Sequence, residues 1–171
     1  GLNLEVCVGQ YEYQVGICDG IDAADQVVIS KYLLRRIAEM EDLDVDFSAK
    51  PVKSCLFNGS GMHTNISTLS TRDKSKGFET IIQYMEKLEV RHDHHMKVYG
   101  DDNRERMTGN LETSSYDTFS YGVANRGASI RIPRQTAFNK CGYFEDRRPT
   151  VSACPYQVTS VIAETLLNTE E

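Results

Sequence analysis

The sequence VANRGASIRIP at residues 123–133 and the sequence GYFEDRRP at residues 142–149 are the most informative stretches of this 171-residue chain. Both are short, largely apolar and bounded by glycine or proline, yet together they carry four arginines, Arg126, Arg131, Arg147 and Arg148, beside the acids Glu145 and Asp146. A guanidinium group binds a carboxylate or phosphate through two parallel hydrogen bonds, and a buried one needs an anionic partner. The two stretches therefore predict an anionic ligand, with a metal held by Glu145.

The composition excludes several classes of function. The net charge is −6, whereas proteins that bind nucleic acid or anionic membranes carry a basic excess. No apolar run approaches the roughly 18 residues of a membrane span. The length predicts one domain. The five cysteines form no C-x-x-C pair, which favours a reducing compartment, so we expect a cytoplasmic protein.

Alternating apolar and polar residues at the start of the chain predict two strands, at residues 4–8 and 11–15. If residues 8 and 9 formed a two-residue turn, Glu5 and Glu12 would face each other across the hairpin. Like charges in that position repel, so the pair would need a cation between them. The chain begins at Gly1 without Met, which suggests an excised piece of a longer protein, and a processed N-terminus is the alternative.

The pattern from residue 22 onwards predicts a first helix. Asp22 is its expected N-cap, Asp25 lies in the first turn, and the pair Lys50-Pro51 marks the exit to extended chain. The residues expected on its core side share one helical face: Val28, Tyr32, Leu33, Ile37 and Met40.

Two more helices are predicted, from about Phe78 to Tyr99 with Gly100 as a stop, and from Pro155 onwards. Their expected core residues also lie at helical spacing: Phe78, Ile81, Ile82, Met85 and Leu88 in the first, and Val158, Val161, Ile162 and Leu166 in the second. Residues 101–127 are rich in turn-forming residues and are expected to form long loops between short strands. The expected class is α+β, with a sheet covered by helices.

A glycine-rich stretch, NGSGMHTN at residues 58–65, combines a small-residue loop with an imidazole. Glycines allow the backbone to approach a ligand, and the alternation after His63 predicts a strand that would hold the ring in place. A single histidine is more often a structural hydrogen-bonding residue. Together with Glu5, Glu12 and Glu145, however, His63 would complete an oxygen-rich site suited to Mg²⁺ or Mn²⁺.

Other polar stretches are less informative. The sequence HDHH at residues 92–95 is better interpreted as a polar helix face than as a metal cluster, since no carboxylates converge on it. Arg106 stands where ordered chain resumes after a solvated loop. Glu112 lies in a polar loop and is either an ordinary exposed acid or a mobile catalytic one. Arg148 is expected to be a structural ion-pair residue.

Taken together, these stretches resemble glutamine synthetase of the eukaryotic type. The matching sequences are QYEYQVG at residues 10–16, NGSGMHTN at 58–65, MTG at 107–109 with Glu112-Thr113, and both arginine stretches. The resemblance extends from about Glu5 to Leu166, in the family's order and spacing. It implies an incomplete catalytic domain with the family's guanido kinase-like fold, in which the sheet is mostly antiparallel and helices cover it.

The resemblance also implies an activity: ATP-dependent ligation of ammonia to L-glutamate, giving L-glutamine through γ-glutamyl phosphate. The positions that match divalent-metal ligands are Glu5, Glu12, His63 and Glu145. Those that match glutamate-binding residues are Gly59, Arg106, Arg126 and Arg147. Those that match nucleotide-binding residues are Asn65, Ser67, Arg126, Arg131 and Tyr143. Glu112, Arg126 and Arg147 match catalytic positions, and Glu112 would lie on a flap that closes over the intermediate.

The chain also departs from the family pattern. Tyr11 and Phe57 stand where tryptophan is usual, Leu111 replaces a histidine beside the flap glutamate, and residues 53–56 are unlike the common loop. The resemblance covers only the C-terminal part of such an enzyme, without the N-terminal β-domain and the strand that carries two further metal-binding glutamates. Because family active sites form between subunits of a homo-oligomer, we expect this chain alone to be inactive.

Two alternatives to this enzyme remain open. One is a non-catalytic relative that keeps the fold for a structural role, although such relatives should lose their ligands first and every matching position here holds a suitable residue. The other is a ligase of the same family that acts on another amine. Arg126 and Arg147 favour an amino-acid substrate, but most of the amine site lies outside this chain.

Overall fold

The computed structural model of the chain describes residues 1–57, 59–111 and 113–167. Its helices and strands follow in this order: β1 (Leu2–Leu4), β2 (Tyr11–Tyr13), α1 (Asp22–Met40), β3 (Thr64–Ile66), α2 (Gly77–Val90), α3 (His92–Met96), the 3₁₀ turn η1 (Asn103–Glu105), β4 (Tyr121–Val123), β5 (Ile130–Ile132), α4 (Arg134–Asn139), β6 (Phe144–Asp146) and α5 (Pro155–Leu167). The expected α+β class is confirmed. None of the described helices is both long and apolar enough to cross a membrane.

The main sheet has four short strands in the order β3-β6-β5-β4. β6 pairs antiparallel with both β3 and β5, whereas β4 and β5 run parallel. The two arginine-bearing stretches supply two of the four strands and the end of a third, because β5 lies within the first stretch, β6 lies within the second, and β4 ends at Val123, where the first stretch begins. β6, which carries Glu145 and is followed directly by Arg147 and Arg148, occupies an interior position in the sheet.

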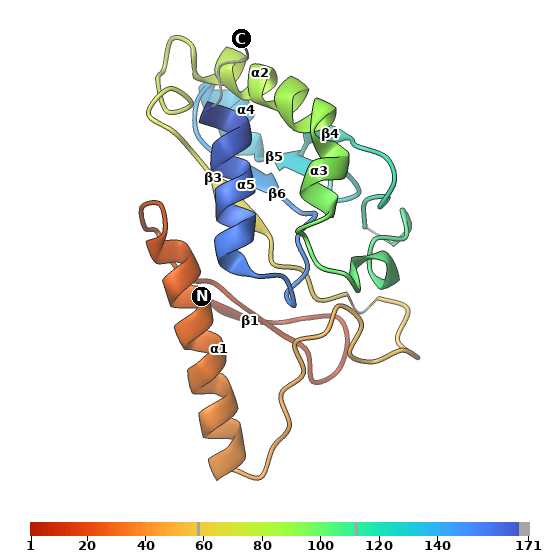
Figure 1. Cartoon of the computed structure of the whole chain (residues 1–171). Coiled ribbons are helices and arrows are strands. Elements are labelled where there is room, and N and C mark those ends of the chain that lie inside the picture. The colour runs from red at the N-terminus through yellow and green to blue at the C-terminus, as the bar shows by residue number, and fades with distance from the viewer. Residues whose placement is uncertain (58, 112, 168–171) are drawn as a thin grey trace.

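Helices α2 and α5 cover one face of this sheet (Figure 1). Phe144, Ile130 and Ile132 point from the sheet into that layer and are almost fully buried. The residues that meet them from the helices are those that helical spacing predicted: Ile81, Met85, Leu88, Val158, Val161, Ile162 and Leu166 are buried, and Phe78 and Ile82 pack at the edge. Burying an aliphatic side chain of this size contributes roughly 1.5–3 kcal/mol, so this layer is the main source of stability.

The second predicted helix is interrupted. It ends at Val90, Arg91 leaves the helical conformation, and α3 begins at His92. The break reorients the chain so that His92 and His95 face the core instead of the solvent. Gly100, the predicted stop, does follow in a left-handed conformation with φ of 108°.

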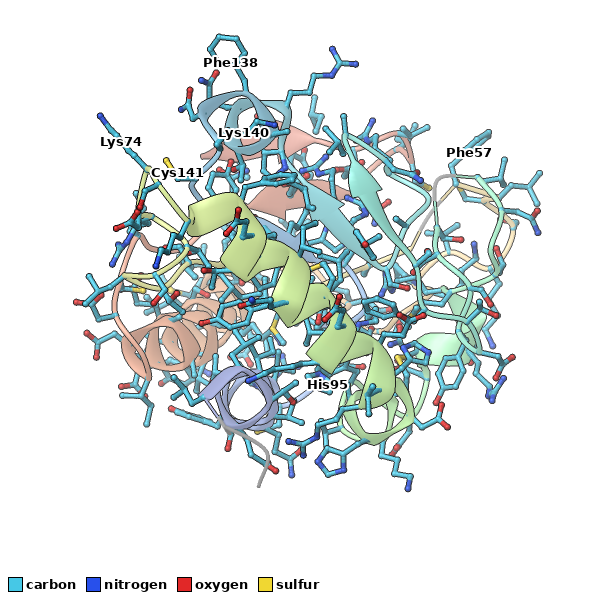
Figure 2. All side chains as sticks on the ribbon, turned by 90° about the horizontal axis from the view of Figure 1, so that it is seen from above. Phe57, Lys74, His95, Phe138, Lys140 and Cys141 are labelled. Carbon is cyan, nitrogen blue, oxygen red and sulfur yellow. The ribbon has the colours of Figure 1, made fainter. Side chains whose placement is uncertain are left out.

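The first predicted helix is present, but its surroundings differ from expectation. α1 begins at Asp22, whose side chain makes no capping hydrogen bond, and it ends at Met40, well before Lys50-Pro51. All five of its predicted core residues are exposed, and only Ala24 and Ala38 are buried. α1 contacts the rest of the molecule along α5, where Tyr156 donates a hydrogen bond to Asp25. Figure 2 looks down the two helices and shows them side by side.

The N-terminal hairpin has shorter strands than predicted. β1 and β2 pair antiparallel with Leu4 opposite Tyr11 and Asn3 opposite Glu12. The prediction that Glu5 and Glu12 are cross-strand partners is therefore wrong. Its assumed two-residue turn does not form, because the connection instead spans residues 5–10 and is closed by hydrogen bonds from Glu5 N to Gln10 O (2.9 Å) and from Gln10 N to Cys7 O (3.0 Å).

Residues 101–127 form mainly loops, as predicted. In the described part of this region, η1 and β4 are the only regular elements. After η1, a bridge joins Thr108 to Ser115, and Gly109 N donates a hydrogen bond to Ser114 O (3.2 Å).

Candidate active site

A row of polar side chains crosses the face of the sheet that the helices leave uncovered. The strand register places Asn65 of β3 and Arg131 of β5 directly opposite Glu145 of β6. Because successive side chains of a strand point to opposite faces, the neighbours of Glu145, Phe144 and Asp146, point into the helical layer. The sheet thus presents an amide, a carboxylate and a guanidinium side by side.

Glu145 is the centre of this row. Its carboxylate accepts from Arg131 Nε at 2.5 Å, and Arg147 Nη1 lies 3.4 Å from it. His63 Nδ1 lies 3.3 Å from Oε1. The side chain is only 6% exposed, and burial by itself would raise its pKa. The hydrogen bond with His63 and the nearby positive charges outweigh burial, so the net effect is a lowered pKa and an ionised carboxylate.

His63 stands at the entrance to β3, directly after the glycine-rich loop. Burial and the positive charges of Arg147 and Arg106 lower the pKa of the imidazole, more than its hydrogen bond with Glu145 raises it. The ring is therefore neutral at physiological pH. A neutral imidazole is the form that binds a metal ion.

Glu5 and Glu12 meet through their side chains although they are not cross-strand partners. The hydrogen bond between the two carboxyl groups raises the pKa of Glu5 and lowers that of Glu12. Two carboxylates can make this contact only if a proton or a cation lies between them. The charges of His63 and Glu145 also affect the pKa of Glu12, so the pair Glu5–Glu12 lies near the pair His63–Glu145.

The four predicted ligands do not converge on one point in this structure. They form the pairs Glu5–Glu12 and His63–Glu145, and across residues 1–57, 59–111 and 113–167 no three His, Cys, Asp or Glu side chains are close enough to hold a metal ion. The chemistry of the donors nevertheless fits a hard divalent cation, since three carboxylates and a neutral imidazole are oxygen-rich ligands of suitable charge.

Arg106 is buried beneath the glycine-rich loop. Its Nη2 donates to the carbonyl oxygens of Arg147 (3.0 Å), Arg148 (2.7 Å) and Pro149 (3.3 Å). A Cβ added at Gly59 would lie 2.5 Å from Arg106 Cγ, so only glycine allows the loop to pass over this side chain. Burial and the charge of Arg147 lower the pKa of Arg106 to about 10. Arg106 thus holds the backbone that follows β6.

The remaining predicted binding residues differ in how exposed their side chains are. Arg147 is 10% exposed, and burial lowers the pKa of its guanidinium. Arg126 is exposed in the turn between β4 and β5. Its positive charge helps to lower the pKa of both Glu5 and Arg147. Ser67 and Tyr143 are exposed. Glu112, the predicted flap acid, lies outside the described residues.

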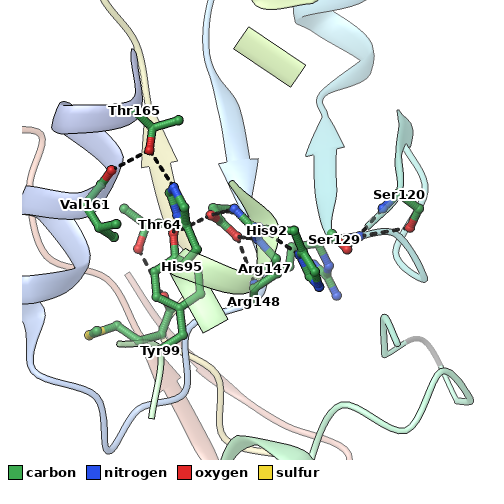
Figure 3. Close-up of polar contacts among 12 residues, drawn as sticks. Thr64, His92, His95, Tyr99, Ser120, Ser129, Arg147, Arg148, Val161 and Thr165 are labelled. Carbon is green, nitrogen blue, oxygen red and sulfur yellow. Dashed lines mark hydrogen bonds and ion pairs between the residues drawn. The ribbon is translucent and has the colours of Figure 1, made fainter. Parts of the chain in front are cut away.

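A buried polar network lies on the opposite face of β6 (Figure 3). Arg148 and Asp146 form a two-pronged ion pair with N···O distances of 2.9 and 2.7 Å, and both side chains are fully buried. Tyr99 donates to Asp146 (2.8 Å) and contacts His95 Nδ1 (2.6 Å). The prediction that Arg148 is a structural ion-pair residue is confirmed.

His92 and His95 complete this network, so the polar helix face expected at residues 92–95 is buried at these two positions. His95 Nε2 contacts Thr165 of α5 at 2.7 Å. His92 bonds Arg148 Nη1 (3.1 Å) and the carbonyl of Tyr116 (2.9 Å). Sequence reasoning also missed Gln10, which donates to the Gly59 carbonyl (3.2 Å) and fixes the hairpin to the glycine-rich loop.

We expect stability to fall as the pH falls from about 6.5 towards 3, partly because of His95. Burial, together with the charge of Arg148, lowers the pKa of His95 to about 3, whereas an unfolded histidine has a pKa of about 6.5. Between these values the unfolded chain binds a proton that the folded chain does not, so each pH unit costs up to about 1.4 kcal/mol. Urea unfolding of His95→Gln should show a shallower loss of stability between pH 7 and pH 5.

The matched control is His94→Gln, because His94 is exposed and adjacent. It should retain the pH dependence of the parent chain. An unchanged slope in His95→Gln would show that His95 does not titrate in this way.

This chain is similar in sequence to glutamine synthetases. The model of the glutamine synthetase catalytic domain matches residues 2–89. Glutamine synthetases of Emericella nidulans and Schizosaccharomyces pombe are 55% and 53% identical to this chain over 166 residues, which cover 97% of this chain and 46% of each relative. A cytosolic isozyme of Oryza sativa is 50% identical over 167 residues, 98% of this chain and 46% of the relative.

Solved structures support the same fold. A cryo-electron microscopy structure of Plasmodium falciparum glutamine synthetase superimposes with a TM-score of 0.71 at 19% identity, over 95% of this chain and 32% of that chain. This chain spans about half the length of the curated relatives it matches. With the family model matching residues 2–89, the chain belongs to the glutamine synthetase catalytic-domain family.

Proposed function

We propose that this chain is part of an ATP-dependent glutamate–ammonia ligase, which forms L-glutamine from L-glutamate and ammonium. The observation that carries the proposal is the arrangement around Glu145, a buried and ionised carboxylate in contact with Arg131, Arg147 and His63 on the uncovered face of the sheet. A reaction between two anions, glutamate and ATP, needs such a concentration of positive charge next to a cation-binding carboxylate.

The proposed metal ligands are Glu5, Glu12, His63 and Glu145. The contact between the side chains of Glu5 and Glu12 supports this assignment, because a divalent cation between the two carboxylates would relieve their repulsion. When bound, Mg²⁺ or Mn²⁺ would neutralise phosphate charge and polarise the γ-phosphoryl group of ATP.

We assign the proposed substrate contacts according to how deeply each arginine is buried. Arg147, with Arg126 and the loop at Gly59, would bind and orient the carboxylates of glutamate, while Arg106 supports the backbone beneath them. Arg131 with Asn65, Ser67 and Tyr143 would contact the nucleotide. A carboxylate oxygen of glutamate then attacks the γ-phosphorus, ADP leaves, and ammonia displaces phosphate from γ-glutamyl phosphate. Glu112 is the proposed acceptor of the proton that ammonium loses.

The chain covers about half of its relatives' length, so we propose that activity needs further polypeptide, including the family's N-terminal β-domain. The complete protein would be a cytoplasmic homo-oligomer with active sites at subunit interfaces. The finer fold assignment, a partial guanido kinase-like catalytic domain, belongs to the same proposal.

The direct test is to express the full-length coding sequence and measure glutamine formation. We expect formation that requires ATP, ammonium and Mg²⁺ or Mn²⁺, and none from residues 1–171 alone. Glutamine formation by residues 1–171 would contradict the need for further polypeptide. A full-length protein that binds ATP but forms no glutamine would favour a non-catalytic relative, and a product formed only with a larger amine would favour a ligase of different specificity.

A further inference from the structure

Asn103 is a buried amide beside the candidate site that no step of the proposed function uses. It begins the 3₁₀ turn η1 and is 0% exposed. Its Nδ2 donates to the carbonyl of Arg148 (2.7 Å), and its Oδ1 accepts from Nε of Arg106 (3.2 Å). Buried polar groups are costly to leave without partners, so these two bonds hold both partners in one arrangement.

The two bonds require opposite chemistry at the two ends of the side chain. A carbonyl oxygen only accepts a hydrogen bond and the Nε–H of an arginine only donates one, so the group between them must donate at one end and accept at the other. The amide of asparagine does both. Aspartate in its place could bond only to Arg106, and leucine, which is similar in size, could bond to neither.

Through these bonds Asn103 acts on the backbone that carries Arg147. Arg106, whose Nε is bound to Asn103, donates through Nη2 to the carbonyls of Arg147 (3.0 Å) and Arg148 (2.7 Å). The backbone N–H of Arg147 donates to the carbonyl of Ser129 (2.9 Å). The peptide groups on both sides of the Arg147 side chain are therefore fixed, one by Ser129 and the other by Arg106 and Asn103 together.

We propose that Asn103 is a positioning residue of the candidate active site, which acts with Arg106 to set the backbone from which Arg147 extends towards the carboxylate of glutamate. The contact between Arg147 and Glu145 is long, at 3.4 Å, so the direction of the guanidinium depends strongly on the backbone that carries it. The effect on glutamate binding rests on the proposed function, whereas the effect on the backbone does not.

The effect on the backbone is tested in the 171-residue chain by amide hydrogen exchange. In Asn103→Leu, the exchange rate of the Arg147 amide should rise by about 10-fold relative to that of Leu88, which lies in α2 within the buried layer. The control is Thr165→Val, which removes a buried hydrogen bond to His95 on the other side of the sheet and should change both rates by the same factor. Rates that rise by the same factor in Asn103→Leu would overturn the proposal.

The effect on the site is measured in the full-length protein. Asn103→Leu should raise the KM for glutamate by about 10-fold, because a small displacement of a binding group is costly. The KM for ATP should stay within about twofold, since Arg131, the proposed nucleotide contact, is held by the pairing of β5 with β6. A merely structural role would lower kcat through the amount of folded enzyme and leave both KM values unchanged, and that result would contradict the role assigned to Asn103.

A double substitution tests whether Asn103 acts through Arg147. Once Arg147→Ala has removed the guanidinium, adding Asn103→Leu should raise the KM for glutamate by less than about twofold further. If the two increases multiplied instead, Asn103 would act on glutamate by another route and the proposal would be wrong.

Two further outcomes are covered by the same design. If Asn103→Leu does not fold, Asn103→Asp gives the same comparisons, because it keeps the acceptor for Arg106 and loses only the donor to Arg148. If the full-length parent forms no glutamine, the proposed function fails, and the exchange rates of the Arg147 and Leu88 amides then decide the role of Asn103.

Discussion

Replacing Arg148 by methionine should lower the free energy of unfolding by about 3–5 kcal/mol, because it leaves a buried carboxylate without its cation. Asp146 and Arg148 are both fully buried, and the guanidinium binds the two carboxylate oxygens at 2.9 and 2.7 Å. The ion pair holds the pKa of Asp146 down despite burial. Methionine fills much of the arginine's volume, so the loss measures charge and not a cavity. Urea unfolding followed by circular dichroism gives the value.

A second variant separates the ion pair from the packing around it. Replacing both partners, with Asp146→Leu and Arg148→Met, should recover most of the loss, since apolar residues of similar volume often substitute for a buried pair without cost. A residual loss of about 1 kcal/mol is expected because Tyr99 would lose the acceptor of its hydrogen bond.

The surface control is Arg36→Met. Arg36 pairs with Glu39 on α1, where both side chains are more than half exposed, so the change should be within about 1 kcal/mol. A loss in Arg148→Met no larger than in Arg36→Met would contradict the role assigned to the buried pair.

The core residues of α2 could be predicted, because apolar residues at helical spacing form one face of a helix and that face is buried here. Ile81, Met85 and Leu88 recur at the helical period, and all three are buried. The same spacing failed for α1, where Tyr32 and Met40 are exposed. An apolar stripe shows that a helix is amphipathic, but it does not show which segment of polypeptide covers the stripe.

The candidate site could be predicted only as a set of residue types. The stretch that contains Glu145, Asp146, Arg147 and Arg148 alternates in a strand, which directs Glu145 and Arg147 to the open face and the other two into the core. That period of two was available in the sequence, and it separates the proposed binding residues Glu145 and Arg147 from the buried ion pair of Asp146 and Arg148. The contact between Arg148 and His92 could not be predicted from the sequence, because His92 belongs to a different element and reaches Arg148 only through tertiary packing.

The contact between Glu5 and Glu12 shows the opposite case, in which the two side chains meet although they are not cross-strand partners. A two-residue turn was assumed because alternation of side chains does not determine turn length. The true connection is longer and shifts the register, so that Glu12 faces Asn3. The two carboxyl groups still meet because Glu5 lies just beyond the strand and its side chain reaches across.

In the full-length protein, Arg147→Ala should weaken glutamate binding by about 2–5 kcal/mol, which is roughly 30-fold to several-thousand-fold in affinity. The guanidinium is largely buried, and its contact with Glu145 is long, at 3.4 Å. Burial also lowers its pKa, which means that the charged form lacks the solvation it would have in water. An incoming carboxylate would supply that stabilisation, and its loss should appear in the KM for glutamate.

Two matched variants make this expectation specific. Arg147→Lys keeps the charge but cannot form two parallel hydrogen bonds, so it should fall between the parent and Arg147→Ala. Arg131→Ala removes the other guanidinium that contacts Glu145 and should raise the KM for ATP more than the KM for glutamate. If both alanine variants raised the two KM values in the same ratio, the two arginines would act only by fixing Glu145, and the separate assignment of substrate and nucleotide contacts would be wrong.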